Sequence, residues 1–369
     1  MSGEENEPGN DHDASEQRRG QYGQPARGGA KCRVAVQEWG QRIEHRADNI
    51  RPMPKIRAAV IGVGYLGRFH AQKYATAEGC ELLAVVDPRA EAREAVGREL
   101  GCQALASHTA LLGKVDAVSI VTVTPAHFAI AADFLRAGAH VLVEKPITET
   151  VQQARELIQL AAAQNKVLQV GHLERFNPAV IAAEPFLRAP RFIECQRLAP
   201  FKQRGTDVNV VLDLMIHDID IIETIVRSPI VSIDAVGSAV FSNEIDIANA
   251  RIRFANGCVA NTTASRVSLK TERKLRVFNA DAYISIDLQQ RILTVVRKHA
   301  GATADALPVQ IEEQSFEQGD ALRAEIESFL SCVRLGARPV VTGEDGLRAL
   351  ETATRITAQV ESGSKEVLQ

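Results

Sequence analysis

The stretch IRAAVIGVGYLGRFHAQKYATAEGCELLAVVD, residues Ile56–Asp87, decides the fold of this chain. An apolar run predicts a buried strand, and the G-x-G-x-x-G pattern Gly62-Val63-Gly64-Tyr65-Leu66-Gly67 then opens a helix. The first glycine of such a pattern permits a tight turn, the second lets a phosphate approach the backbone, and the third lets the helix pack against the strand. The order of strand, glycine turn, helix and second strand predicts a dinucleotide-binding unit rather than an isolated turn.

Asp87 ends the second strand, twenty positions after Gly67. A carboxylate at this place accepts hydrogen bonds from ribose hydroxyls and repels a 2′-phosphate. The helix N-terminus after the glycines offers free N–H groups to a pyrophosphate. We therefore expect NAD to be preferred over NADP, and Arg89 is the residue that could soften this preference.

Length and composition exclude several classes of protein. The chain has 369 residues, of which 45% are hydrophobic, and its net charge is −3. Such a length predicts two domains, and so small a charge argues against nucleic acid as a partner. We expect no membrane insertion and a cytoplasmic location, because no bilayer-spanning stretch and no signal peptide are recognisable. The six cysteines stand singly, so we expect free thiols and no bound metal.

Residues 1–54 differ in composition from the rest of the chain. They are rich in Gly, Glu, Arg, Gln and Asn and show no sustained period, so we expect a disordered extension. A brief amphipathic run around Trp39 is a candidate short helix or partner contact. Met53 stands just before the first strand, and one hypothesis is that translation starts there. The intact mass of the native protein would decide this.

The remaining sequence divides into two parts that differ in the order of their predicted strands and helices. Over residues 55–172 apolar strands alternate with helical patterns, which predicts an α/β Rossmann domain with a doubly wound, mostly parallel sheet. Over residues 173–369 long strand-like runs follow one another, preceded by one aliphatic helix and followed by two more. This predicts an α+β domain with a large open, mainly antiparallel sheet. We expect Val, Ile and Phe on its open face, which would favour a homodimer or homotetramer.

Glu144-Lys145-Pro146 directly follows a predicted strand of the first domain. The carboxyl ends of parallel strands are where ligands bind in such folds. Lys145 is therefore a candidate active-site residue, and Glu144 either pairs with it or contacts the nicotinamide ribose. The plain alternative is a surface turn with a solvated lysine.

The aliphatic helix over residues 210–226 carries a polar stripe on one face. Asp213 and His217 stand four residues apart on it and so share that face. Either this face is merely solvated, or Asp213 and His217 form a satisfied core pair or a catalytic pair. In the catalytic interpretation, Asp213 orients His217 and raises its pKa, and the imidazole takes a hydroxyl proton while hydride leaves the carbon. Lys145 is the alternative base.

Together these motifs resemble the Gfo/Idh/MocA oxidoreductases, over roughly residues 55–362. The resemblance implies a Rossmann domain that binds NAD(P), a C-terminal sheet domain that carries substrate residues, and oxidation of a secondary alcohol on a sugar or cyclitol. It implies catalytic roles for Lys145, Asp213 and His217. The implied cofactor-binding residues are Gly62, Gly64, Tyr65, Leu66, Gly67, Asp87, Thr122, Thr124, Pro125, His127, Glu144 and Lys145.

A narrower resemblance concerns the stretch VGHLERFNP, residues 170–178. This stretch, with residues 196–201 and 204–207, is similar to bacterial UDP-N-acetylglucosamine 3-dehydrogenases. It implies a UDP-sugar substrate and a downstream aminotransferase on a lipid A precursor route. Basic residues here either bind the pyrophosphate or form interdomain ion pairs. The expected substrate-binding residues are Lys145, Arg175, Asn177, Arg197, Arg204, Asp213 and His217.

Two other functions compete with this one. The first is a dehydrogenase of a free polyol such as inositol, or of a UDP-sugar acid. The second is a regulatory protein that senses NAD without catalysis. A sensor needs no base and lysine aimed at one point, so the co-occurrence of Lys145 and His217 argues against it. The sequence does not determine the ring carbon, the direction of the reaction or the number of subunits.

Overall fold

The computed structural model describes residues 54–202, 208–299 and 308–367. Residues Lys55–Gln369 form one compact unit. The expectations for the N-terminal extension, for Trp39 and for Arg204 fall outside the described residues.

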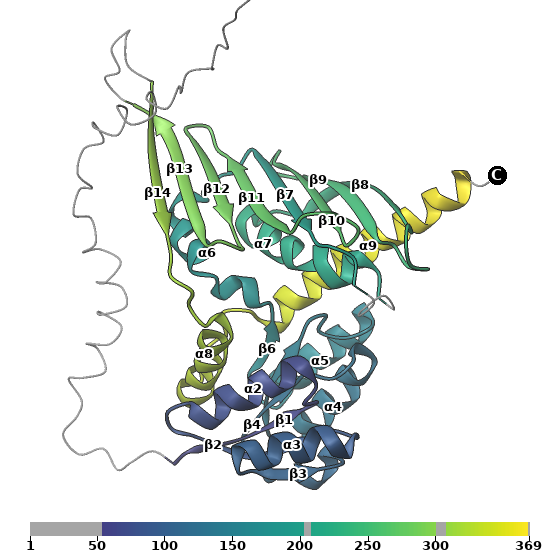
Figure 1. Cartoon of the computed structure of the whole chain (residues 1–369), viewed down its shortest axis with the longest axis vertical. Helices are drawn as coiled ribbons and strands as arrows, with labels where there is room; N and C mark the ends of the chain where they lie inside the picture. Colours follow the sequence, from purple (N-terminus) through teal and green to yellow (C-terminus); the bar gives the residue numbers. More distant parts are fainter. Residues whose placement is uncertain (1–53, 203–207, 300–307, 368–369) are drawn as a thin grey trace, which may run out of the picture. The chain divides into compact units, whose positions relative to one another are not determined.

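The first of the two sheets has six strands in the order β3-β2-β1-β4-β5-β6 (Figure 1). All neighbouring strands are parallel, which confirms the predicted Rossmann architecture. The short strand β3 gave no sequence signal, because three half-exposed residues cannot show a period. The strands are β1 (Ile56–Ile61), β2 (Cys80–Val86), β3 (Gln103–Leu105), β4 (Ala117–Ile120), β5 (His140–Glu144) and β6 (Leu168–Gly171).

Helices cover both faces of this sheet, and one of them comes from the far end of the chain. The helices that follow the strands are α2 (Tyr65–Thr76), α3 (Ala90–Leu100), α4 (Thr124–Arg136) and α5 (Val151–Ala163). Helix α8 (Ala321–Leu335) packs beside α2, where Ile326 and Phe329 join the core formed by Val60 and Tyr74. The chain therefore returns from the second sheet to complete the first, although sequence order places α8 with the second domain.

The second sheet has eight strands in the order β14-β13-β12-β11-β7-β10-β9-β8. Its neighbours are antiparallel except for β7 and β10, which run parallel, so the sheet is mixed but mainly antiparallel as predicted. Strand β14 was not predicted, because it is an exposed edge strand and shows no apolar alternation. The strands are β7 (Phe192–Leu198), β8 (Ile230–Ser238), β9 (Ile247–Phe254), β10 (Val259–Ser265), β11 (Glu272–Phe278), β12 (Ala282–Asp287), β13 (Ile292–Lys298) and β14 (Val309–Ser315).

One face of this sheet is covered by helices and the other is open. The covering helices are α6 (Pro178–Ala183), α7 (Ile216–Val226) and α9 (Gly343–Val367), with a π-helical turn at Val211–Met215 before α7. Short 3-10 turns lie at His108–Leu111, Leu173–Phe176 and Glu184–Phe186. No helix among the described residues combines the length and the apolar character needed to cross a membrane.

The expectation of Val, Ile and Phe along the open face is wrong for most of that face. In β9 the apolar residues, such as Ala250 and Ile252, point toward the helices, while Asn249 and Arg251 are exposed on the open side. The alternation was real, but a period of two does not by itself say which side is buried. The apolar exceptions include a row at one end, where Phe192, Phe278 and Tyr283 cluster and Val296 and Ile311 follow in register, and the exposed Val236 of β8.

Candidate active site

The glycine turn between β1 and α2 has the shape of a phosphate cradle. Gly62 has φ +87°, and a Cβ on it would lie 2.5 Å from the Val121 carbonyl oxygen. A Cβ on Gly67 would lie 1.8 Å from the Gly62 carbonyl oxygen, so neither position accepts a side chain. A Cβ on Gly64 would meet only Arg89, at 3.5 Å, so the space outside this backbone is open. Gly64 caps α2 without a side-chain hydrogen bond, which leaves N–H groups for a pyrophosphate.

A cleft of about 700 Å³ runs from this turn to the end of β5. Its lining unites most of the predicted cofactor-binding residues: Gly62, Gly64, Tyr65, Leu66, Gly67, Asp87, Thr122, Glu144 and Lys145. Sites of this size hold cofactors in many enzymes. The residues therefore fit the NAD that the sequence implied.

Thr124, Pro125 and His127 lie at the start of α4 and do not line this cleft. His127 is buried, with Nδ1 2.9 Å from the Pro146 carbonyl oxygen and Nε2 3.1 Å from that of Thr122. Burial lowers its pKa, so the ring is neutral and only one of its two nitrogens carries a proton to donate to a carbonyl. Its place indicates that it holds the loop after β4 against the loop that carries Lys145.

The carboxylate of Asp87 already has hydrogen-bond partners within the protein, which the sequence did not suggest. Its carboxylate accepts from the Val63 N–H at 3.0 Å and from the Arg89 N–H at 3.0 Å, and it pairs with the Arg89 guanidinium at 3.1 Å. Burial raises the pKa of this carboxyl, but the hydrogen bonds from Arg89 and Val63 outweigh that effect and lower it. A ribose diol can reach the carboxylate once the Arg89 side chain, which is 67% exposed, moves aside.

This arrangement yields a prediction for cofactor choice. We expect NAD to bind at least about tenfold more tightly than NADP, a difference of about 1.4 kcal/mol. Arg89→Ala should widen the gap, because the guanidinium is the cation placed to meet a 2′-phosphate. Calorimetric titration of both cofactors into both proteins measures it. Equal affinities in the wild-type protein would show that Arg89 offsets the carboxylate.

Lys145 reaches from the end of β5 to the segment before α7. Its Nζ donates to the Asp213 carbonyl oxygen at 2.7 Å and lies 3.3 Å from Asp213 Oδ1. The Lys145 side chain is mostly buried, and its backbone N–H donates to Glu144 Oε2 at 3.3 Å. The two candidate segments therefore meet, and Lys145 is not the solvated surface lysine of the plain alternative.

His217 and Asp213 do not form the pair that their spacing suggested. Asp213 lies in the π-helical turn, where the backbone is wider than in an α-helix, and its side chain contacts Lys145. His217 Nδ1 is buried without a hydrogen-bond partner in the described structure. Burial, followed by the positive charges of Lys145 and Arg197, holds the pKa of His217 well below its usual range. The expectation that Asp213 raises this pKa is therefore wrong.

The imidazole of His217 is neutral at ordinary pH and can accept a proton. It lies edge-on to His172, with ring centroids 6.3 Å apart. Burial and the charge of Lys145 lower the pKa of His172 to about 3, and neither of its nitrogens has a partner in the described structure. Sequence reasoning gave His172 no role, although it lies in the VGHLERFNP stretch. His172 and His217 are thus two neutral, largely desolvated imidazoles under the influence of the Lys145 charge.

Two of the predicted substrate-binding arginines form ion pairs within the protein. Arg197 is buried, with Nη2 2.8 Å from Asp218 Oδ1 and Nη1 3.0 Å from Glu174 Oε1. Arg175 lies 3.5 Å from Asp220 and 3.8 Å from Asp345. These contacts match the ion-pair alternative that the sequence left open.

The side chain of Asn177, another expected substrate-binding residue, also makes hydrogen bonds within the protein. Its Oδ1 accepts from the Ala179 N–H at 3.1 Å and caps α6, and its Nδ2 donates to the Leu288 carbonyl oxygen at 2.9 Å.

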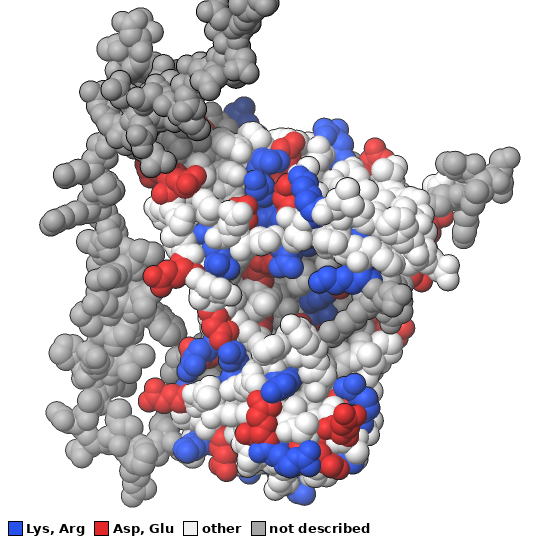
Figure 2. Space-filling model, in the orientation of Figure 1, with Lys and Arg blue, Asp and Glu red and all other residues white. Residues whose placement is uncertain are grey.

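On the face drawn in Figure 2, basic and acidic side chains are interspersed rather than gathered by sign.

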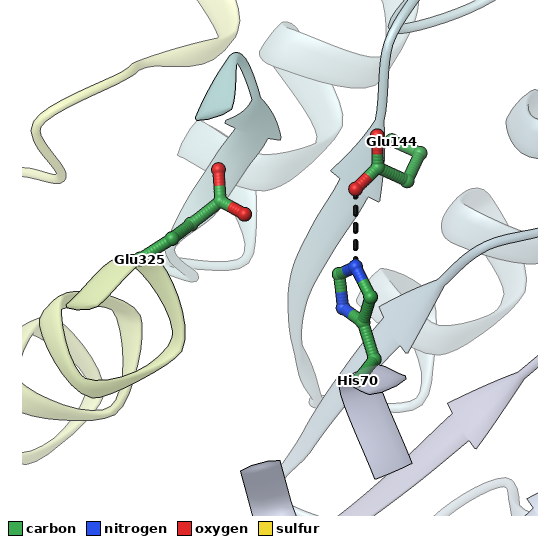
Figure 3. A group of neighbouring side chains, drawn as sticks. All are labelled: His70, Glu144 and Glu325. Carbon is green, nitrogen blue, oxygen red and sulfur yellow. Dashed lines mark hydrogen bonds and ion pairs between the residues drawn. The ribbon is translucent and has the colours of Figure 1, made fainter. Parts of the chain in front are cut away.

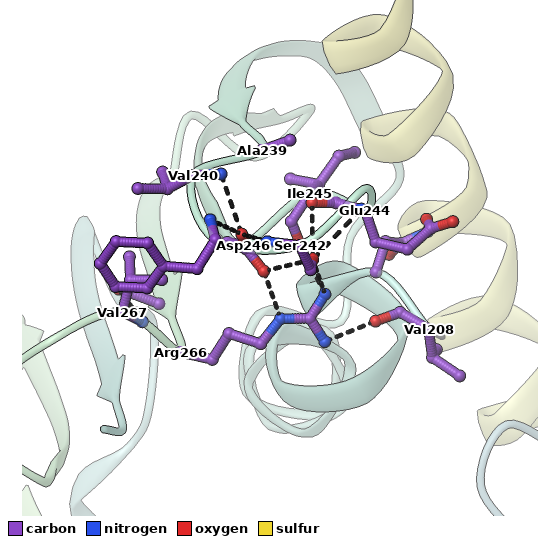
Figure 4. A network of polar contacts seen from close by, with 12 residues as sticks. Val208, Ala239, Val240, Ser242, Glu244, Ile245, Asp246, Arg266 and Val267 are labelled. Atoms are coloured by element: carbon purple, nitrogen blue, oxygen red, sulfur yellow. Dashed lines mark hydrogen bonds and ion pairs between the residues drawn. The ribbon is translucent and has the colours of Figure 1, made fainter. Parts of the chain in front are cut away.

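A buried network that the sequence did not reveal anchors the segment that leads into the π-helical turn and α7 (Figure 4). Asp246 accepts from the backbone of Val240 at 2.8 Å and from Arg266 Nε at 2.7 Å. Arg266 also donates to the Val208 carbonyl oxygen at 2.6 Å. Burial raises the pKa of Asp246, but hydrogen bonds from Ser242 and then Arg266 lower it strongly overall. The network thus fixes the chain just before the turn that carries Asp213.

Comparison with known proteins defines the class. A model of the oxidoreductase family GFO_IDH_MocA, NAD-binding Rossmann fold, matches residues 56–172, and the model of its C-terminal alpha/beta domain matches residues 197–367. The chain therefore belongs to the Gfo/Idh/MocA oxidoreductase family. It is an NAD-dependent dehydrogenase that acts on hydroxyl groups.

Individual relatives narrow the comparison. The chain is 41% identical to UDP-N-acetylglucosamine 3-dehydrogenase of Acidithiobacillus ferrooxidans, over 84% of this chain and 99% of the relative. A solved structure of that protein has a TM-score of 0.80 over 84% of this chain and 99% of that chain. Identity to scyllo-inositol 2-dehydrogenase (NAD(+)) of Bacillus subtilis is 26%, over 84% of this chain and 95% of the relative.

Proposed function

We propose that this dehydrogenase oxidises the 3-hydroxyl of UDP-N-acetylglucosamine to the 3-keto sugar, with NAD as the oxidant. The observation that carries the proposal is the 41% identity over 99% of a relative with that name. The inositol 2-dehydrogenases are only 24–28% identical to this chain. The alternative of a cyclitol substrate rests on these weaker matches.

The chemistry divides among the residues of the cleft. NAD, when bound, supplies the hydride acceptor. The glycine turn and the α2 N-terminus hold its pyrophosphate, and Asp87 receives a ribose diol. The substrate carbon loses a hydride and its hydroxyl loses a proton, which leaves a C=O group. Lys145, held in place by Asp213, polarises that oxygen, and His217 takes the proton.

A screen of NADH formation tests the substrate. We expect kcat/KM for UDP-N-acetylglucosamine to exceed that for myo-inositol and scyllo-inositol by at least about 10²-fold, because a site built for many polar groups rejects analogues that lack them. A UDP-sugar acid and UDP-glucose complete the panel, and Lys145→Met serves as the inactive control. Faster turnover of a cyclitol would move the protein to the polyol class. NAD binding with no turnover of any substrate would favour the sensor interpretation.

We also propose the cellular setting that this reaction implies. A 3-keto nucleotide sugar is a substrate for an aminotransferase that makes a 3-amino lipid A precursor. The proposal places the enzyme in the cytoplasm, where reduced thiols such as the five free cysteines of the described residues persist. The aromatic cluster on the open sheet face supplies apolar surface for a homodimer or homotetramer. A monomer in light scattering at micromolar concentration would contradict the last point.

A further inference from the structure

A buried polar cluster of His70, Glu144 and Glu325 adjoins the cleft through Glu144 (Figure 3). It joins three elements: His70 comes from α2, Glu144 from the end of β5, and Glu325 from α8. One polar atom from each of the three side chains lies within 4.8 Å of the other two such atoms. His70 and Glu325 are fully buried, whereas Glu144 also lines the cleft beside Lys145.

Hydrogen bonds from two directions converge on the Glu144 carboxylate. His70 Nε2 lies 3.1 Å from Glu144 Oε1, and the Lys145 backbone N–H donates to Glu144 Oε2. Behind His70, its Nδ1 lies 3.3 Å from Ser119 Oγ, which lies 2.9 Å from the Tyr74 hydroxyl. If Tyr74 donates to Ser119 and Ser119 to Nδ1, the imidazole proton sits on Nε2 and points at Glu144. Every hydrogen in the chain then has an acceptor.

Glu325 differs from the other members because its carboxyl group has no partner. Neither of its oxygens has a hydrogen-bond partner among the described residues, and no basic group of that part of the chain forms an ion pair with it. A buried, unpaired carboxylate is far costlier than a buried carboxylic acid. Burial, and then the charge of Glu144, raises the pKa of Glu325 well above its usual value.

The pKa of Glu144 moves the opposite way. Burial raises it, but the hydrogen bond from His70 and the positive charge of Lys145 lower it overall. The two carboxyl groups therefore hold one proton between them, and it belongs to Glu325. The nearest charged acceptor for the Glu325 O–H is the Glu144 carboxylate.

We propose that Glu325 is a positioning residue: it stays protonated and, by a rotation of its side chain across a gap of at most 4.8 Å, donates a hydrogen bond to Glu144. This hydrogen bond fixes the ionised Glu144 carboxylate beside Lys145. The groups that face Glu325 are His70 and Tyr74 on α2, Glu144 at the end of β5, and Gln169 on β6. Gln169 Nε2 donates to the Glu325 carbonyl oxygen at 3.3 Å, which ties α8 to the sheet at this point. Helix α8 thereby completes the cofactor domain chemically as well as by packing.

The inference rests on the proposed function only where it gives Lys145 a catalytic role, and its first test needs no substrate. A carboxyl whose pKa is raised on folding contributes stability below its unfolded pKa of about 4.3, and that contribution is lost as the pH rises toward the folded pKa. Denaturant unfolding of wild type and Glu325→Gln across pH 4–9 measures it. We expect the Gln variant to gain on the wild type as the pH rises, because its amide cannot ionise. A difference that is constant with pH would overturn the proposal.

The second test uses turnover and a matched pair of variants. Glu325→Gln keeps an N–H donor at the same place, so we expect its kcat within about threefold of wild type, the effect of one neutral hydrogen bond at most. Glu325→Leu has no donor, and we expect its kcat to fall on the order of tenfold with an altered pH profile and unchanged KM. Equal losses in both variants would overturn the positioning role.

A metal ion is the competing occupant of these three side chains. A bound metal would require an ionised Glu325. EDTA would then lower the melting temperature of the wild type but not that of Glu325→Gln, and Mn²⁺ or Zn²⁺ would restore the wild-type value. That result would also overturn the proposal. Because unfolding is measured without substrate, a failed substrate screen leaves the proton assignment intact, and a failed pH test leaves the proposed reaction intact.

Discussion

Replacing His217 by Asn is expected to lower kcat by roughly 10²–10⁴-fold, the usual contribution of a positioned general base. Affinity for NAD should stay nearly unchanged, because His217 does not line the cofactor cleft. The variant should also lose the acid limb of the pH–rate profile. Since burial and Lys145 hold the pKa of His217 well below its usual range, that limb should lie below the pH at which ordinary histidines titrate.

Lys145→Met separates the two candidate bases. If His217 is the base, the lysine variant should lose rate because the substrate oxygen is no longer polarised, yet keep the acid limb. Loss of the limb in the lysine variant and its retention in the histidine variant would transfer the base role to Lys145. Asp213→Asn is the matched control: it keeps the carbonyl that binds Lys145 Nζ and removes only the charge at 3.3 Å.

Asp213→Asn should therefore lower kcat less than either His217→Asn or Lys145→Met. Steady-state kinetics across pH, with calorimetric NAD binding for each variant, provide the measurements. Near-normal turnover in both His217→Asn and Lys145→Met would refute this site and revive the NAD-sensing interpretation.

The second large effect concerns stability. Arg197→Met should lower the free energy of unfolding by about 3–5 kcal/mol, because removal of one partner of a buried ion pair leaves the other charge unpaired. Here two carboxylates lose their partner, Asp218 at 2.8 Å and Glu174 at 3.0 Å, and Asp218 is buried. Urea unfolding followed by circular dichroism measures the loss.

Arg273 offers a matched control for this prediction. It lies 3.7 Å from the same Glu174, but its side chain is 48% exposed. Arg273→Met should therefore cost less than about 1 kcal/mol. If Arg197 instead binds a substrate pyrophosphate, Arg197→Met would raise KM strongly and leave unfolding almost unchanged, which is the opposite result.

The sequence alone determined the cofactor domain. A glycine pattern between a strand and a helix has mechanical requirements that are local, so the sequence is sufficient to assign Gly62 and Gly67. The same holds for the parallel order of the first sheet, because alternating strands and helices leave few other topologies. The cofactor followed from Asp87, which stands at a fixed distance from the turn.

Only the tertiary structure decided how the candidate residues pair. A spacing of four suggested that Asp213 supports His217, but the π-helical turn directs Asp213 to Lys145, and nothing in the residue types announces such a turn. Burial decided the pKa of His217, and burial is a property of the whole fold. The positive charge of Arg197 suited both a substrate pyrophosphate and an internal ion pair. Its partners, Asp218 and Glu174, lie on other elements, so only the fold could identify them.

Long-range packing is the reason why the remaining features were invisible in the sequence. Glu325 stands 181 positions after Glu144 along the chain, so no periodicity links them, yet α8 folds back onto the first sheet and brings them together. Asp246 and Arg266 meet in the same way across neighbouring strands. Local pattern fixes turns, strands and the residues at their ends. The partner of a buried charge is chosen by whichever distant segment the core brings beside it.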